Sequence, residues 1–342
     1  MPFSPTELEH PIVQAPMGGG ASTPALAAAV CEAGGLGFLA AGYLAPDAVR
    51  KNIEAVRERT RLPFGVNLFA PPQPVPDPAA LERYARALAE DHEVGEPRHD
   101  DDGWEEKLAL LAELRVPVVS VTFGCPERAV VERLQQAGAA VWITVTTPDE
   151  ARIAEEAGAD ALLVQGVEAG GHRATFDDSA PNDLGLLAAL QLVAAASALP
   201  LVATGGIATG RGVAAVLAAG AAAAQLGTAF ILAPEAATAD AHRRAIAGGG
   251  ETALTRAFTG RTARGIVNRF QREHSVAAPL GYPDVHHVTA PLRSAARERG
   301  DADGFHLWAG QAHALAEAVP AGELVRRLAA EARAALQQAA RR

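Results

Sequence analysis

Eight short apolar stretches, most of them followed by a pattern typical of a helix, constrain the fold of this chain more than any other feature. Each stretch is continuously apolar rather than alternating, as expected for parallel strands that are buried on both faces. Strand–helix units in such a series predict an α/β fold, a (β/α)8 TIM barrel, with a doubly wound open sheet as the alternative. The expected strands are residues 12–16, 37–41, 64–68, 118–122, 141–145, 161–165, 201–203 and 223–226.

Helices are expected between these strands, and several of them end in an Ala-Gly pair followed by a small residue. Ala33-Gly34 and Ala157-Gly158 are examples. Glycine can adopt the left-handed conformation that ends a helix and turns the chain toward the next strand. The expected helices are residues 24–33, 46–59, 127–137, 148–157 and 210–219.

Residues 1–234 are therefore expected to form the barrel, with one insertion. Residues 71–103 are too long for a simple connection, contain several prolines and include the acidic run Asp100-Asp101-Asp102. They predict a partly mobile insertion after the third strand.

Beyond the barrel, residues 235–318 are expected to form an appended α-helical subdomain or lid. Residues 236–272 and 294–318 have helical patterns and no evident strand partners. Residues 319–342 are rich in alanine and arginine, and they predict a C-terminal helix that packs on the barrel.

Composition and charge weigh against several classes of function. Hydrophobic residues make up 49% of the chain, and the formal net charge of -10 argues against a nucleic-acid surface. Residues 212–234 are uncharged, but their alanines, glycines and Gln225 favour a buried helix and strand over a membrane span. No signal peptide is visible and the 2 cysteines cannot form a disulfide framework, so we expect a cytoplasmic protein without a membrane partner.

The expected strands end in an uncharged, glycine-rich set of residues. In a (β/α)8 barrel these ends form the site. Asn67 and Gln165 could read the amide edges of a planar heterocycle. Thr204-Gly205-Gly206 and Gly227-Thr228 follow the seventh and eighth strands, where free N–H groups and a helix N-terminus can bind a phosphate. Each turn alone is equally explained by tight strand–helix packing, but two such turns after adjacent strands favour a phosphate-binding site.

The segment Gly170-Gly171-His172 follows the sixth expected strand. Glycines allow another molecule to approach the main chain closely, and a histidine is suited to moving a proton near neutral pH. The alternative is a flexible loop with a surface histidine. The position at a strand end favours a catalytic histidine over that alternative.

Other polar residues have simpler interpretations. Cys125 is expected to line the pocket rather than act as a nucleophile. His286-His287 is not expected to bind metal, because neighbours in an extended segment point in opposite directions. Asp177-Asp178 could cap a helix, pair with Arg173 or be solvated, with solvation as the default. Glu168 could support His172 or lie at the surface.

Taken together, several segments resemble the FMN-dependent nitronate monooxygenases, formerly called 2-nitropropane dioxygenases. The resemblance covers most of residues 11–311 in the right order, and the combination is specific although no single motif is. The segments are residues 11–20 (PIVQAPMGGG), 65–69 (GVNLF), 164–172 (VQGVEAGGH), 203–207 (ATGGI), 225–228 (QLGT) and 308–311 (WAGQ).

The resemblance implies noncovalent FMN in a barrel with an appended α-helical domain. It implies His172 as the catalytic histidine, and Trp308 and Gln311 as residues that close the cofactor side of the cleft. Ala174 departs from the family pattern, in which a glycine is expected. The implied FMN contacts are Met17, Asn67, Gln165, Gly170, Gly171, Gly205, Gly206, Gln225, Leu226, Gly227 and Thr228.

The implied activity is the oxidation of alkyl nitronates, and of nitroalkanes, by dioxygen to carbonyl compounds and nitrite through a flavin semiquinone. His172 would act as a base on a neutral nitroalkane or as a cationic partner of the nitronate oxygens. The partners are the small substrate and dioxygen, with no nucleic acid, and a homodimer is an open expectation.

Two alternatives stay open at this point. One is an FMN-dependent NAD(P)H enoyl-thioester or quinone reductase on the same scaffold. The absence of a G-x-G-x-x-G segment after a strand counts only mildly against it. The other is a phosphate-binding barrel without flavin, which would leave Asn67, Gln165 and the Gly-Gly-His turn without an obvious task.

Overall fold

Parallel strands form a barrel in the computed structural model, which describes residues 3–180 and 182–341. The sheet is 8-stranded, in the order β1-β9-β8-β6-β5-β4-β3-β2. A parallel bridge between Val13 and Leu36 joins the two ends of this order, so the sheet closes on itself. The predicted (β/α)8 barrel is confirmed. Its strands are β1 (Ile12–Gln14), β2 (Phe38–Ala40), β3 (Gly65–Phe69), β4 (Val118–Thr122), β5 (Ala140–Val145), β6 (Ala161–Gln165), β8 (Leu201–Thr204) and β9 (Ala223–Leu226).

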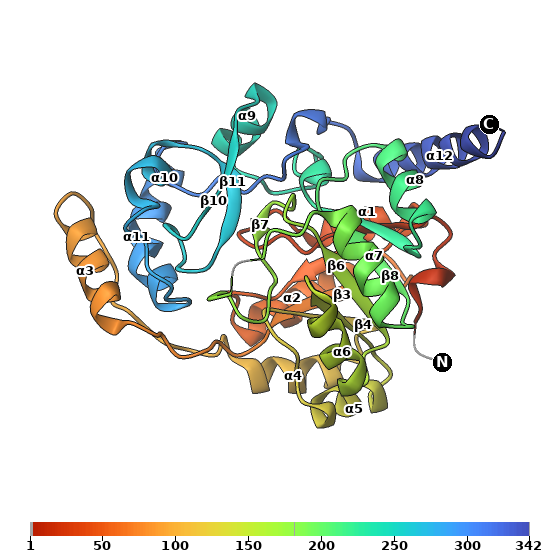
Figure 1. The fold of residues 1–342 in the computed structure, drawn as a ribbon, viewed down its shortest axis with the longest axis horizontal. Helices are drawn as coiled ribbons and strands as arrows, with labels where there is room; N and C mark the ends of the chain where they lie inside the picture. Colours follow the sequence, from red (N-terminus) through yellow and green to blue (C-terminus); the bar gives the residue numbers. More distant parts are fainter. Residues whose placement is uncertain (1–2, 181, 342) are drawn as a thin grey trace.

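Helices surround the sheet, as Figure 1 shows for α4 to α7. Two of them begin at a Thr-Pro pair: the side chains of Thr23 and Thr147 accept a hydrogen bond from a backbone N–H of the first turn. Proline after such a cap has the backbone angle a helix needs and lacks an N–H that would go unpaired. The helices around the barrel are α1 (Pro24–Glu32), α2 (Pro46–Arg57), α4 (Trp104–Glu113), α5 (Arg128–Gln136), α6 (Pro148–Ala157), α7 (Leu186–Ala196) and α8 (Gly210–Ala218).

The barrel interior is filled at one end by large side chains. Trp142 and Phe38 are fully buried, with ring centroids 5.9 Å apart, and Phe3 stacks on Trp142 at 6.4 Å. These rings occupy the first part of the strands, near their amino ends. The opposite end, where the strands terminate, is therefore the end at which a cavity can open.

Residues 236–318 are not wholly helical, and this part of the sequence-based expectation was wrong. Strands β10 (Thr252–Thr255) and β11 (Ala263–Ile266) form a 3-stranded antiparallel sheet with β7 (Gly171–His172). β10 is only partly buried and contains two threonines, and β11 contains Arg264 and Gly265, so neither shows the continuous apolar pattern of the barrel strands. The helices in this region are α9 (Asp240–Gly248), α10 (Arg269–His274) and α11 (Asp284–Glu298). Beyond Glu298 the expected helix over 294–318 is replaced by turns, irregular chain and a short 3-10 helix at His313–Leu315.

The insertion at 71–103 is packed against this second layer. Its helix α3 (Pro78–Ala89) lies beside α11, at the left edge of Figure 1. Leu81 and Leu88 are buried in one cluster with Phe258 and Val285. The hydroxyl of Tyr84 donates a hydrogen bond of 2.8 Å to the carbonyl of Ala257. The insertion thus extends the second layer.

The chain ends in helix α12 (Ala321–Ala340), which packs against α8 and α1. Leu324, Val325 and Leu328 are buried on its inner face.

The predicted ranges 1–234 and 319–342 also include residues 1, 2, 181 and 342, which lie outside the described residues. No helix in the described part of the chain combines the length and apolarity needed to cross a membrane. Two further 3-10 helices lie at Pro5–Glu7 and Thr228–Phe230.

Candidate active site

A cavity of about 750 Å³ opens at the carboxyl ends of the barrel strands. Its walls come from the barrel and from the second layer, which contributes His286, Arg293 and Trp308. A volume of this size is typical of a small-molecule or cofactor site. The sequence-predicted residues that line it are Met17, Asn67, Gln165, Gly170, Gly171, His172, Gly205, Gly206, Gln225, Leu226, Gly227, Thr228 and Trp308.

Gln311 is the exception among the predicted residues. Its side chain is exposed and it does not line the cavity. Its backbone N–H donates a hydrogen bond of 3.0 Å to the carbonyl of Glu168. Gln311 therefore ties the segment after Trp308 to the turn that precedes His172 through its main chain alone.

The two amide side chains expected to read a heterocycle have different surroundings. Asn67 accepts hydrogen bonds at Oδ1 from the hydroxyls of Ser120 and Thr122, at 2.8 and 2.9 Å. These two bonds fix the orientation of the amide and leave its NH₂ group as the free end in the cavity wall. Asn67 is thus available to a ligand as a donor.

The side-chain amide of Gln165 instead makes its hydrogen bonds to residues 172–174, in the segment that follows its own strand. Its Oε1 accepts hydrogen bonds from Nη1 of Arg173 at 2.9 Å and from the N–H of Ala174 at 3.0 Å. Its Nε2 donates to the carbonyl of His172 at 3.0 Å. Gln165 therefore fixes the main chain on which His172 stands, a task that residue type and spacing did not reveal.

Unpartnered polar groups and bare backbone at the cavity fit a nucleotide-like cofactor. Nε2 of Gln225 is buried and has no hydrogen-bond partner within the described residues. The backbone N–H groups of Gly205 and Gly206 donate to no acceptor in the same part of the chain. Both glycines have positive φ angles, of 120° and 66°, and a Cβ on Gly206 would lie 2.9 Å from Cβ of Glu168. The loop is therefore restricted to glycine and presents donors suited to an anionic group.

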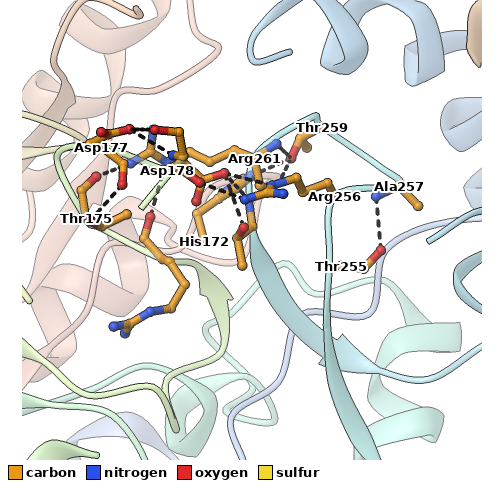
Figure 2. A network of polar contacts seen from close by, with 12 residues as sticks. His172, Thr175, Asp177, Asp178, Thr255, Arg256, Ala257, Thr259 and Arg261 are labelled. Atoms are coloured by element: carbon orange, nitrogen blue, oxygen red, sulfur yellow. Dashed lines mark hydrogen bonds and ion pairs between the residues drawn. The ribbon is translucent and has the colours of Figure 1, made fainter. Parts of the chain in front are cut away.

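His172 lies in a strand rather than in a flexible loop. In β7 it pairs with Ala263 of β11, which joins the barrel to the second layer. Its Nε2 lies 2.9 Å from Oγ1 of Thr259. Figure 2 shows His172 within the network of polar contacts that contains Thr259 and Arg261. The imidazole thus has a fixed position at the cavity wall.

Aromatic rings surround the His172 imidazole. The ring centroids of Phe123, Tyr282 and Trp308 lie 5.5, 6.1 and 5.5 Å from it. Phe123 has a φ angle of 77°, in the left-handed region that costs a bulky residue about 1–2 kcal/mol. Strain of this kind is concentrated at functional sites, where the surrounding structure holds the residue in place.

The imidazole of His172 is neutral over the physiological pH range. Burial, followed by the positive charges of Arg261 and Arg293, lowers its pKa to about 3. Arg261 is held over the ring of Phe123, with its guanidinium carbon 4.1 Å from the ring centroid, and its Nε donates to the carbonyl of Arg173. A neutral imidazole can accept a proton but cannot supply a positive charge.

His286 and His287 lie in helix α11, so the expectation that they stand in an extended segment was wrong. His286 stacks on Tyr43, with centroids 4.0 Å apart, and lines the cavity. His287 lies 3.0 Å from the carboxylate of Asp100. Within residues 3–180 and 182–341, no group of three His, Cys, Asp or Glu side chains is arranged to hold a metal ion.

Three other expectations are corrected by the structure. Cys125 does not line the cavity but packs against the barrel core. Asp178 is buried and pairs with Arg256, Nε to Oδ2 3.1 Å, whereas Asp177 is exposed. The carboxylate of Glu168 accepts the N–H of Leu186 at 2.9 Å, at the start of α7. Glu168 therefore caps a helix and does not support His172.

Comparison with known proteins is consistent with this geometry. The family model described as nitronate monooxygenase matches residues 4–331. A nitronate monooxygenase of Pseudomonas aeruginosa is 43% identical over 95% of this chain and 97% of its own length. The chain belongs to the nitronate monooxygenase family.

Solved structures related to this nitronate monooxygenase family member extend the comparison. The crystal structure of nitroalkane oxidase from Streptomyces ansochromogenes is 53% identical, with a TM-score of 0.94, and the match covers 97% of this chain and 98% of that one. The structure of FabK from Thermotoga maritima is 28% identical, with a TM-score of 0.78, over 98% of this chain and 96% of that one. This chain is accordingly an oxidoreductase of a flavoprotein family.

Several residues that line the cavity of this family member were not predicted from the sequence as site residues. Tyr43, Thr259, His286 and Arg293 all come from loops or from the second layer. None of them lies in a barrel strand, as Asn67 does. Apart from residue type, nothing in the neighbouring sequence marks them as site residues, because the tertiary arrangement alone brings them to the strand ends.

The neutral histidines at the cavity predict that the free energy of unfolding falls as the pH falls below about 6.5. Burial lowers the pKa of His286 to about 2 and of His242 to about 4, and places the pKa of His306 well below its ordinary value. Unfolded histidines take up protons near pH 6.5, so below that pH the unfolded chain binds more protons than the native protein. Each such histidine costs about 1 kcal/mol of stability between pH 6.5 and 5.5.

Urea unfolding at pH 7.5 and pH 5.5 measures this loss. His286→Phe keeps a ring beside Tyr43 but removes one titrating group, so its loss between the two pH values should be about 1 kcal/mol smaller. An equal loss in both proteins would show that His286 is not held neutral by the fold.

Proposed function

We propose that this enzyme uses FMN to oxidise alkyl nitronates, and also neutral nitroalkanes, with dioxygen, giving carbonyl compounds and nitrite. The observation that carries this proposal is a neutral imidazole, His172, at the wall of a cavity that also contains the arginine side chain of Arg293. A proton acceptor near positive charge is what the conversion of a nitroalkane to its nitronate anion requires.

The fit of the cavity residues supports FMN as the cofactor. Gly205 and Gly206 would hold the phosphate through their N–H groups, with Gly227 and Thr228 on the neighbouring strand end. The free NH₂ of Asn67 and the unpartnered Nε2 of Gln225 would donate to acceptors on the flavin. When bound, FMN supplies the electron acceptor for the nitronate. Gln165 would act indirectly, through the turn that carries His172.

His172 would remove the Cα proton of a neutral nitroalkane. The electron pair of the broken C–H bond then delocalises onto the nitro group, so negative charge appears on its oxygens. Arg261 and Arg293 hold the His172 pKa down through their positive charges, and the same charges favour the nitronate anion over the neutral nitroalkane. Phe69 and Phe123, 4.5 Å apart by ring centroids, supply an apolar wall for the alkyl chain.

A nicotinamide-dependent enoyl-thioester reductase is the second candidate. It is favoured by the similarity to the FabK structure, which covers 98% of this chain at 28% identity. Such a reductase must accept a hydride from NADH or NADPH, whereas nitronate oxidation needs no nicotinamide.

Anaerobic mixing separates the two candidates. The purified enzyme is combined with propyl nitronate, NADH or NADPH while the flavin absorbance is followed. We expect bleaching by propyl nitronate and none on the same timescale by either nicotinamide. Rapid bleaching by a nicotinamide, with no response to the nitronate, would replace the proposed function by the reductase.

A further inference from the structure

Among the residues that the structure describes, the His172 ring makes one hydrogen bond, and it is made by Nε2. The partner is Oγ1 of Thr259, at 2.9 Å, and Thr259 is only 2% exposed. Within residues 3–180 and 182–341, Nδ1 has no hydrogen-bond partner, and it is not among the buried atoms that are sealed from solvent. Since His172 lines the cavity, Nδ1 is the ring nitrogen that a substrate can reach.

The direction of the Thr259 bond decides which nitrogen carries the proton. Oγ1 of Thr259 also lies 3.3 Å from the carbonyl oxygen of Arg261, to which its hydroxyl can donate. If that bond forms, Oγ1 accepts from Nε2–H of His172, and Nδ1 keeps a free lone pair. In the opposite arrangement the hydroxyl donates to Nε2, and Nδ1 carries a hydrogen and cannot act as a base.

We propose that Thr259 is a positioning residue that holds His172 in the Nε2–H tautomer, with Nδ1 as the base for a neutral nitroalkane. This inference rests on the proposed function. Thr259 is bonded to the imidazole and is almost fully buried, so we assign it a role that acts through His172. Its hydroxyl passes the hydrogen-bond chain on to the carbonyl of Arg261.

Other contacts already fix the position of the ring, so what the Thr259 bond determines is the tautomer of the imidazole. The main chain of His172 is held by Gln165 Nε2, at 3.0 Å from its carbonyl, and by the pairing of β7 with β11. The rings of Phe123, Tyr282 and Trp308 lie around the imidazole. In the described part of the chain none of these aromatic side chains accepts a hydrogen bond from Nε2, whereas Oγ1 of Thr259 can.

The same arrangement serves both protonation states of the histidine. The Cα proton of the nitroalkane moves to Nδ1, the C–H electron pair stays on the nitronate, and His172 becomes an imidazolium. Nε2–H still donates to Thr259, and the bond is strengthened because its donor is now charged. The Arg261 carbonyl completes the chain, and the nearby guanidinium groups of Arg261 and Arg293 oppose the positive charge on the ring.

The test compares Thr259→Val with Thr259→Ser and with a matched control. Valine keeps the shape of threonine and removes the hydroxyl, whereas serine keeps the hydroxyl. Thr255→Val is the control, because Thr255 is a buried threonine of the same hairpin that bonds Ser275 and does not line the cavity. Each variant is purified with its cofactor and assayed with nitroethane and with preformed ethyl nitronate at equal pH.

We expect Thr259→Val to lose on the order of 10²-fold in kcat/KM with nitroethane, because the base is no longer presented in the right form. With ethyl nitronate, which needs no proton removal, the loss should stay within about threefold, on the same principle that only the proton-transfer step depends on this base. The deuterium isotope effect with 1,1-dideuterated nitroethane should rise. Thr259→Ser should restore most of the activity, and Thr255→Val should match the unchanged enzyme on both substrates. Equal losses on both substrates in Thr259→Val would assign Thr259 a purely structural role and overturn the inference.

A measurement without turnover decides the tautomer directly. ¹⁵N-histidine labelling, with His172→Asn to assign the signal, should show a protonated Nε2 and an unprotonated Nδ1 in the unchanged enzyme. The signals should move toward a mixture of tautomers in Thr259→Val. A protonated Nδ1 in the unchanged enzyme would overturn the inference.

The outcomes also separate this inference from the proposed function. An enzyme that oxidises nitronates but no neutral nitroalkane keeps the nitronate part of the proposed function, and it loses both the neutral-nitroalkane part and the role of Nδ1 as a base. A flavin that responds only to a nicotinamide removes the proposed function, and the ¹⁵N measurement still decides whether Thr259 sets the tautomer.

Discussion

Replacing His172 by asparagine is expected to remove most turnover of neutral nitroalkanes while the protein keeps its flavin. Asparagine is uncharged and polar, but it cannot accept a proton at neutral pH. Removing a general base costs about 10²- to 10⁴-fold in rate. The flavin should remain because the turns proposed to hold its phosphate lie after β8 and β9 and do not include His172. Steady-state rates with nitroethane and the flavin-to-protein absorbance ratio measure the two effects.

The preformed nitronate provides the internal control for His172→Asn. If His172 acts as a base, the variant should oxidise ethyl nitronate much better than nitroethane relative to the unchanged enzyme. Near-normal turnover of nitroethane would remove His172 from the catalytic role. Loss of the flavin would instead show that the residue holds the cofactor site together.

Replacing Gly170 by alanine is expected to destabilise the protein and empty the cofactor site. A Cβ at this position would lie 2.5 Å from the backbone carbon of Ala309 and 2.5 Å from the backbone nitrogen of Gly310. Backbone atoms cannot rotate away as a side chain can, so either the turn before His172 or the segment after Trp308 must move. Overpacking of this kind costs about 1–3 kcal/mol. Thermal unfolding and FMN content measure the loss.

Gly171→Ala is the matched control, because Gly171 is constrained by its backbone conformation and Gly170 by the lack of space for a Cβ. Gly171 has a φ angle of 76° but open space around the position of a Cβ, whereas Gly170 has no space. The cost at Gly171 should be the conformational penalty alone, about 1–2 kcal/mol. The segment that carries Trp308 should stay in place, so FMN content should fall less than in Gly170→Ala. A larger loss of FMN at Gly171 would contradict the role given to the Gly170 contact.

The barrel could be predicted because each of its strands carries a local signal. A strand buried on both faces must be apolar throughout, so stretches such as Val118–Thr122 and Ala161–Gln165 are visible in the sequence. The strand ends then identify Asn67, Gln225 and the glycine turns without any tertiary information. These residues line the cavity.

The small sheet could not be predicted in the same way. β11 contains the buried Arg264, whose Nε donates to the carbonyl of Val167 at 3.0 Å. A buried arginine is stable there only because carbonyl oxygens from a distant segment accept its hydrogen bonds. The local pattern of residues 252–266 carries no sign of these partners, so the helical expectation was wrong.

The sequence by itself determined the barrel, the end at which the cavity opens and the histidine that stands there. Apolar stretches and glycine turns act locally, over a few residues, and their effects are readable one segment at a time. The tertiary structure alone decided that Gln165 serves the turn, that His286 reaches the cavity, and that Thr259 meets His172. The last two residues are 87 positions apart, and their contact depends on the pairing of β7 with β11. Such contacts have no local signal, because a polar side chain is compatible with many partners until the packing of the whole chain selects one.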